Sequence, residues 1–198
     1  DRPLQDLADL PRAVRASLAI AVLGAAVFAA QSSAIATATE PRVHGTASAR
    51  FTASSTLHDF SGSAPQSTFA VEPAADGSWT ATVEVPVAAL TTENDSRDRK
   101  MRKMFHAEEH PTLRAEFTHI VPDDVHANGR LPFRLTIAGT SHDVVSTVQD
   151  WRQTDDRIDF IAEFDVSLSA FGLEAPRTFV IVVDDTVHVT TEVSLRRE

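Results

Sequence analysis

From Val43 onward the sequence alternates between apolar and polar residues, and this period of two constrains the fold more than any other feature. In the segment RIDFIAEFDVSL (157–168), every second residue from Ile158 to Leu168 is apolar, and most of the others are charged or polar. Side chains alternate between the two faces of a β-strand, so this pattern predicts a strand with one buried face. The same pattern occurs at 79–87, 113–118, 130–137 and 186–195.

Turn-forming residues separate the predicted strands. Asp76-Gly77, Asn128-Gly129 and the stretch 139–143 are expected to form short turns, and Asp184-Asp185 is interpreted as a further one. Short turns join neighbouring antiparallel strands. The prediction is an all-β fold, an antiparallel up-and-down β-barrel of seven or eight strands, which leaves no sheet edge exposed. An antiparallel sandwich remains the alternative, because periodicity alone does not separate the two.

One segment, 94–105, lacks the alternation and predicts a short amphipathic helix packed across the sheet. Asn94 or Asp95 is the expected N-cap. Met101, Met104 and Phe105 recur at helical spacing, so these side chains are expected to face the sheet.

Composition restricts the classes of function. A chain of 198 residues with 42% hydrophobic and 23% charged residues has room for one ordinary domain and a short extension. The formal net charge of -10 argues against nonspecific nucleic-acid binding, which requires a large basic surface. The absence of cysteine excludes disulfides, thiol catalysis and cysteine metal sites.

Residues 1–38 are predicted to be a secretory signal peptide and its processing region, ahead of a single domain at 39–198. The stretch from Ala16 to Ala30 carries no charge, but it is apolar only from about Leu18. That length is below the roughly 20 residues of a membrane-spanning helix, so a signal is preferred over an anchor.

Small residues favour cleavage of this signal after Ala36 or after Ala38. The residues that precede the apolar stretch are unusually acidic for a signal, so we hypothesise an internal translation start near Val14. The codon at Val14 tests this hypothesis. A secretory signal predicts a periplasmic or secreted protein.

Two candidate catalytic motifs are weak. His106 to His110 fits H-x-x-E-H, but Pro111 directly follows and disfavours a helical conformation at His110, so the two histidines are not expected on one helix face. His58-Asp59 has no nucleophile motif around it and is interpreted as a polar pair at a strand start or barrel mouth. We expect no enzymatic activity and no metal site.

The run from Leu90 to Thr118, preceded by STLHDFSG (55–62) and followed by LTIAGTSHDVV (135–145), resembles the YceI-like family of bacterial periplasmic proteins. The resemblance implies a lipocalin-like antiparallel barrel with a helix laid across it. It also implies a long apolar interior that holds a polyisoprenoid or similar amphiphile, a location in the bacterial envelope and no catalysis.

Particular residues carry this resemblance. The set Asn94, Arg97, Asp98 and Met101 is similar to the family's helix segment. Further matches are Pro111 and Phe117 at a strand entry, and Leu135, Thr136, Ile137 and Gly139 in a hairpin. Phe133 departs from the family, in which many members have glycine, and its side chain is expected to narrow the interior.

The apolar faces and the resemblance together predict a ligand-binding interior. The candidate ligand-binding residues are Phe51, Phe60, Phe69, Trp79, Val83, Val85, Met101, Met104, Phe105, Phe117, Phe133, Leu135, Phe160 and Phe164. The candidate polar residues at the barrel mouth are His58, Asp59, Arg97 and Asp98. From the residues alone, an interior filled by side chains is an equal alternative to a ligand tunnel, and the resemblance favours the tunnel.

The predicted helix carries five basic residues: Arg97, Arg99, Lys100, Arg102 and Lys103. The preferred interpretation is a solvated face with local pairs to Asp95 and Asp98. The alternative is transient contact with an anionic membrane surface or a lipid phosphate.

Two functions follow from the sequence. The first is a non-catalytic envelope carrier or reservoir for an isoprenoid lipid or quinone, which requires no cofactor and has a hydrophobic small molecule as its partner. The second is a filled barrel that acts as a structural or protein-interaction module in envelope stress response. A homodimer is left open.

Overall fold

The computed structural model describes residues 43–175 and 182–197. The predicted signal peptide, its cleavage points and the proposed start at Val14 lie outside the described residues. The strands are β1 (Val43–Ser55), β2 (Phe60–Ser63), β3 (Ser67–Pro73), β4 (Trp79–Pro86), β5 (Thr112–Ile120), β6 (Arg130–Ile137), β7 (Thr140–Gln153), β8 (Arg157–Ser167) and β9 (Val183–Arg197). The helices are α2 (Asp95–Met104) and α3 (Pro122–Asn128), with single 3-10 turns η1 (Val87–Ala89) and η2 (Ser169–Phe171).

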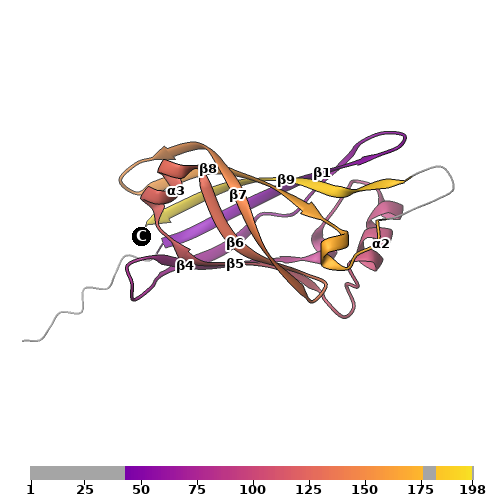
Figure 1. The fold of residues 1–198 in the computed structure, drawn as a ribbon, viewed down its shortest axis with the longest axis horizontal. Helices are drawn as coiled ribbons and strands as arrows, with labels where there is room; N and C mark the ends of the chain where they lie inside the picture. Colours follow the sequence, from indigo (N-terminus) through magenta and orange to yellow (C-terminus); the bar gives the residue numbers. More distant parts are fainter. Residues whose placement is uncertain (1–42, 176–181, 198) are drawn as a thin grey trace, which may run out of the picture. The chain divides into compact units, whose positions relative to one another are not determined.

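The strands form one closed antiparallel barrel (Figure 1). Neighbours pair in the order β2-β1-β3-β4-β5-β6-β7-β8-β9, and β1 also pairs with β9, which closes the sheet. β2 and β3 lie on the same side of β1, opposite residues 50–53 and 43–47 respectively, so together they occupy one of eight strand positions. The predicted barrel is confirmed, and the β1–β9 pairing excludes the sandwich.

Helix α2 lies at one end of the barrel and α3 at the other (Figure 1). α2 begins where predicted, because the side chain of Asn94 accepts a hydrogen bond from the backbone N–H of Arg97 at 3.0 Å and caps the helix. Met101, Met104 and Phe105 then pack against the hydrophobic core beneath the helix, as expected. α2 therefore covers the end of the barrel with an apolar face.

Three of the expected turns are corrected by the structure. Asn128-Gly129 is not a hairpin but the end of α3, an unpredicted helix that has Pro122 in its first turn and Gly129 in the left-handed conformation as its C-cap. Asp184-Asp185 lies inside β9, where the Asp185 carboxylate accepts hydrogen bonds from the turn at Ser167 and Ser169. The turn expected at 139–143 is a tighter one at Ala138-Gly139, so β7 already begins at Thr140.

Strand β7 contains an irregularity that sequence periodicity does not reveal. The β7–β8 register shifts between Gln149 and Arg152, and Asp150 has a positive φ of 52°. This β-bulge changes which residues face inward: Ser146 and Val148 do so before it, and Trp151 does so after it. The bulge thereby adds a tryptophan to the barrel interior.

Candidate functional site: the barrel cavity

The barrel encloses a cavity of about 620 Å³. This volume lies within the range of small-molecule sites, about 300–1,000 Å³. The side chains that line it come from the strands and from α2, and they are predominantly apolar. The interior is therefore not filled by side chains.

Every apolar residue predicted as ligand-binding lines this cavity. These residues are Phe51, Phe60, Phe69, Trp79, Val83, Val85, Met101, Met104, Phe105, Phe117, Phe133, Leu135, Phe160 and Phe164. The structure thus brings them together from seven strands and from α2 with its C-cap residue, Phe105. That they contact a ligand remains a prediction.

Glycines explain how large aromatic residues leave the cavity open. Gly45 lies opposite Phe69 in the β1–β3 pair, and the Phe69 ring lies 2.2 Å from where a Cβ at Gly45 would be. Gly62 and Phe51 repeat this arrangement in the β1–β2 pair, also at 2.2 Å. Each ring therefore lies against the backbone of its neighbouring strand, which a side chain at the glycine would prevent.

Other lining residues are not indicated by the sequence pattern. Small side chains on β1 also line the cavity: Ala47, Ala49 and Ala53. At the α3 end, Trp151 is stacked between His126 and Phe160, with ring centres 5.3 and 5.4 Å away. Alanine is only weakly apolar, so the alternation does not clearly predict that it faces inward. Trp151 was not predicted because the bulge in β7 shifts the alternation before it.

Phe133 occupies the middle of the aromatic lining. Its ring stacks on Phe117 and meets Phe164 edge-on, with centres 5.1 Å apart in both cases. These two rings come from β5 and β8, so Phe133 fills interior space between them, in agreement with the expected narrowing. The cavity is still lined on both sides of this cluster, by Phe105 near α2 and by Trp151 near α3.

The four predicted mouth residues divide into two pairs. His58 and Arg97 line the cavity, whereas Asp59 and Asp98 do not. Asp98 is only 4% exposed, and its carboxylate accepts hydrogen bonds from the backbone N–H and hydroxyl of Thr92 and from the hydroxyl of Thr91. The hydrogen bond from the Thr92 hydroxyl is the main reason that the pKa of Asp98 is lowered. Asp98 therefore anchors α2 instead of facing the mouth.

The basic residues of α2 also differ in position. Arg97 and Lys100 line the cavity, and the Arg97 guanidinium lies 4.8 Å from the centre of the Phe60 ring. Arg99, Arg102 and Lys103 lie outside the lining, and Arg102 donates a hydrogen bond to the carbonyl of Asp98 at 3.3 Å. The charge of Arg102 also helps to lower the pKa of the Asp98 carboxylate, which is buried beneath the helix, so Arg102 is the basic residue of this face that interacts with Asp98.

The H-x-x-E-H histidines do not share a helix face. α2 ends at Met104, before both of them, and His106 has a positive φ of 50°. Within residues 43–175 and 182–197, no three His, Cys, Asp or Glu side chains are grouped closely enough to hold a metal ion. Neither helix in the same ranges is long and apolar enough to cross a membrane.

The fold and the site define a class: a closed, lipocalin-like antiparallel β-barrel around an apolar cavity. A family model of the YceI-like domain matches residues 28–195, and the chain belongs to this family. The resemblance in Leu90–Thr118 and its flanking segments is thereby confirmed. No curated protein matches the sequence significantly.

Solved structures share the fold at low sequence identity. BcnA of Burkholderia cenocepacia is 15% identical, with a TM-score of 0.60 over 75% of this chain and 95% of that chain. A polyisoprenoid binding domain from Saccharophagus degradans is 13% identical, with a TM-score of 0.57 over 78% of this chain and 98% of that one. The YCEI protein of Campylobacter jejuni is 20% identical, with a TM-score of 0.52 over 69% and 84% of the two chains.

Proposed function

We propose that this protein binds a long-chain isoprenoid or related amphiphilic lipid inside its barrel and catalyses no reaction on it. The observation that carries the proposal is the cavity of about 620 Å³, which aromatic and aliphatic side chains line over most of its surface. The similarity to a Saccharophagus degradans domain described as polyisoprenoid binding supports the same ligand class.

The energetics suit a hydrocarbon ligand. Burying one methylene group is worth about 0.8 kcal/mol, so a long prenyl chain binds well without any hydrogen bond along its length. A small polar ligand would leave most of this lining without a favourable partner. The cavity therefore selects for apolar length, and an open cavity favours this function over a filled barrel with a structural role.

We propose further that the protein works as a carrier or reservoir in the bacterial envelope, in the periplasm or as a secreted protein. The family and the signal-like sequence of residues 1–38 support this location. A closed barrel shields a prenyl chain from water, which is what transport of such a lipid through an aqueous compartment requires.

A cavity-filling substitution tests the binding proposal. Ala115 lines the cavity between Val83 of β4 and Leu135 of β6, so Ala115→Phe places a ring inside the barrel. Ala70→Phe adds the same ring at an exposed position of β3 and is the matched control. We expect Ala115→Phe to weaken binding of a prenyl lipid at least tenfold and Ala70→Phe to leave it unchanged.

The readout is built into the protein. The chain has two tryptophans, Trp79 and Trp151, and both line the cavity, so the fluorescence of each reports on occupancy. Circular dichroism establishes that both variants are folded. Equal binding by a folded Ala115→Phe variant and the wild type would contradict binding inside the barrel.

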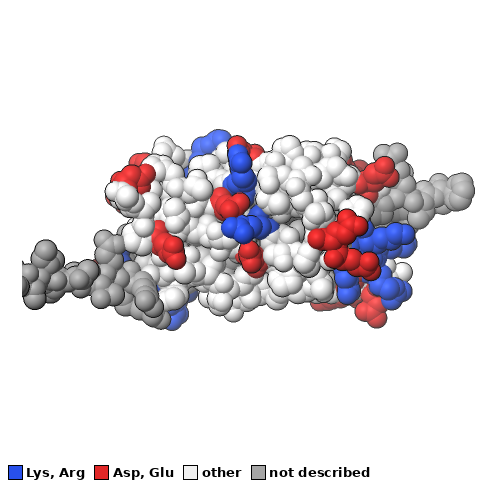
Figure 2. Space-filling model, turned by 90° about the horizontal axis from the view of Figure 1, so that it is seen from below, with Lys and Arg blue, Asp and Glu red and all other residues white. Residues whose placement is uncertain are grey.

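We also propose a transient membrane contact at the α2 end during lipid exchange. Leu57 and Val182 are exposed by 59% and 41%, and they are adjacent because the Thr56 backbone N–H donates to the Val182 carbonyl at 3.1 Å. Basic side chains of α2 lie at the same end, together with acidic ones (Figure 2). The mixture of charges favours a weak and short-lived contact with an anionic surface.

Charge reversal tests this contact. Replacing Arg99 and Lys103, which lie outside the cavity lining, together by Glu is expected to reduce association with liposomes that contain anionic lipid and to slow lipid transfer from them. Neutral liposomes are the control. Unchanged association and unchanged lipid loading would contradict the membrane contact without affecting the proposal that the barrel binds lipid.

A further inference from the structure

The cavity lining is selective in its charge. The chain has 28 acidic and 18 basic residues, yet the lining contains no Asp or Glu among the described residues. It does contain Arg97, Lys100 and Arg114. The charged residues that line the cavity are therefore all basic, although the protein as a whole is acidic.

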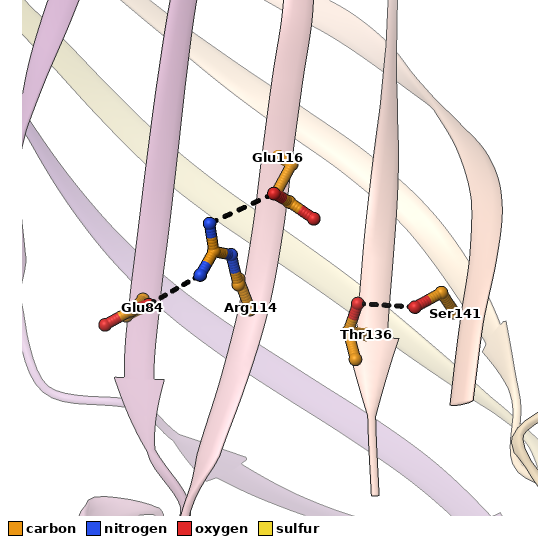
Figure 3. A network of polar contacts seen from close by, with 5 residues as sticks. All are labelled: Glu84, Arg114, Glu116, Thr136 and Ser141. Atoms are coloured by element: carbon orange, nitrogen blue, oxygen red, sulfur yellow. Dashed lines mark hydrogen bonds and ion pairs between the residues drawn. The ribbon is translucent and has the colours of Figure 1, made fainter. Parts of the chain in front are cut away.

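Arg114 is not available to a ligand. Its guanidinium pairs with Glu84 at 3.4 Å and with Glu116 at 3.0 Å, on the neighbouring strand β4 and on its own strand β5 (Figure 3). The residues on either side of it, Leu113 and Ala115, face the interior. Arg114 therefore belongs to the outer surface of the barrel and its charge is balanced there.

Arg97 and Lys100 are in a different situation. In the part of the chain that the structure describes, neither side chain lies within ion-pair distance of a carboxylate. Arg97 is half-buried, and the Phe60 ring holds its guanidinium at 4.8 Å from the ring centre. A cation held at a cavity without a counter-ion is a site where an anion binds favourably.

The side chains of α2 that line the cavity are basic toward the start of the helix and apolar toward its end. Arg97, Lys100, Met101 and Met104 follow the i, i+3, i+4, i+7 spacing of one helix face, and all four line the cavity. The first two are basic and the last two are apolar. Asn94 and Ser96 add hydrogen-bonding groups beside the basic pair. The opposite end, around Trp151, is aromatic and apolar.

We infer that the ligand carries an anionic head group, of the phosphate or carboxylate class, which lies between Arg97 and Lys100 while its hydrocarbon chain extends toward the α3 end. This inference rests on the proposed lipid-binding function and narrows it. Among isoprenoids it favours a prenyl phosphate over a quinone or a free prenol, because only the phosphate uses both cations.

Three ligands with the same chain and different heads test the inference. Geranylgeranyl phosphate, geranylgeraniol and geranylgeranylamine are titrated separately into the delipidated full chain while tryptophan fluorescence is recorded. A hydrogen bond to a charged group is worth about tenfold in affinity, so the phosphate is expected to bind at least about tenfold more tightly than the alcohol, and the amine most weakly. Added salt should reduce the difference in affinity between the phosphate and the alcohol, and the difference between the amine and the alcohol. The affinity for the alcohol itself should not change.

Two double variants locate the effect. Arg97→Gln with Lys100→Gln is expected to lower the affinity for the phosphate at least about tenfold and to leave the alcohol within about twofold. Arg50→Gln with Arg130→Gln removes the same charge from exposed positions outside the lining and should change neither. Inorganic phosphate alone should not compete, since it lacks the chain.

The outcomes are distinct. Equal binding of all three ligands, or an unchanged phosphate affinity in the Arg97 and Lys100 variant, would overturn the head-group inference and leave lipid binding intact. Competition by inorganic phosphate would also overturn it, because the site would then recognise a free anion and not an amphiphile. Failure of every ligand to bind would overturn the proposed function and the inference together.

Discussion

Asp98 of α2 accepts hydrogen bonds from both the backbone N–H and the hydroxyl of Thr92, at 2.8 and 2.5 Å. The preceding residue, Thr91, exchanges two backbone hydrogen bonds with Ser63 of β2. Thr92 therefore joins α2 to the barrel wall through one buried carboxylate. The helix that presents Arg97 and Met101 to the cavity depends on this link for its position.

Replacing Asp98 by Asn is expected to destabilise the protein by about 1–3 kcal/mol. The amide NH2 group would face the N–H and hydroxyl donors of Thr91 and Thr92, from which it cannot accept a hydrogen bond. Chemical denaturation measures the change in the free energy of unfolding. Asp95→Asn on the exposed side of the same helix is the control and should cost much less. A wild-type stability in Asp98→Asn would contradict the anchoring role.

The stability of the barrel should also depend on pH through Asp98. Its pKa is lower in the folded protein than in the unfolded chain, whose aspartates titrate near 3.9, because the Thr92 hydroxyl stabilises the charged form. Its contribution is thus complete above that value and is lost as the pH falls through the folded pKa. The difference in unfolding free energy between wild type and Asp98→Asn should shrink below about pH 4. If this difference in unfolding free energy did not change with pH, the loss of stability in Asp98→Asn would be due to packing and not to the charge.

Phe133→Ala should enlarge the cavity at a cost in stability. Phe133 is buried and contacts Phe117 and Phe164, and removal of such a ring costs about 3–5 kcal/mol. The vacated space should let the variant bind a bulkier or branched chain better, relative to a linear one, than the wild type does. Denaturation and paired lipid titrations measure the two effects. Unchanged chain selectivity would show that Phe133 does not restrict the ligand.

Two glycines allow a matched test of the hairpin between β6 and β7. Gly139 and Gly77 both have positive φ, 78° and 83°, so alanine is strained at either position by about 1–2 kcal/mol. Only Gly139 has a neighbour, the His110 ring, whose nearest atom would lie 2.8 Å from the added Cβ. Gly139→Ala should therefore lower the melting temperature more than Gly77→Ala. Equal shifts would show that His110 moves aside freely.

The parts of the fold that sequence predicts are those with regular spacing. Alternation identified the strand at 157–168, and helical spacing identified α2 together with its cap at Asn94. α3 was missed because it is short and its Asn128-Gly129 end has the composition of a hairpin turn. The turn predicted at Asp184-Asp185 was wrong because these two residues, which are typical of turns, lie in a strand. There the Asp185 carboxylate accepts hydrogen bonds from the neighbouring turn at Ser167 and Ser169.

The candidate site was predictable where large apolar residues carried the signal. Small and irregular positions were not, as Ala49 on β1 and Trp151 beyond the bulge demonstrate. The periodicity of the sequence also does not predict which charged side chain is buried. Asp98 and Arg97 are adjacent in sequence and both polar, and only the fold places one beneath the helix and the other at the cavity.

Native mass spectrometry of the protein purified from a bacterial periplasm, followed by organic extraction of anything bound, determines whether the barrel holds a lipid. We expect a discrete adduct with the mass of a prenyl lipid, reduced in Ala115→Phe and retained in Ala70→Phe. A protein that is free of adducts, and that remains so after incubation with prenyl phosphates, prenols and isoprenoid quinones, would contradict lipid binding in the barrel.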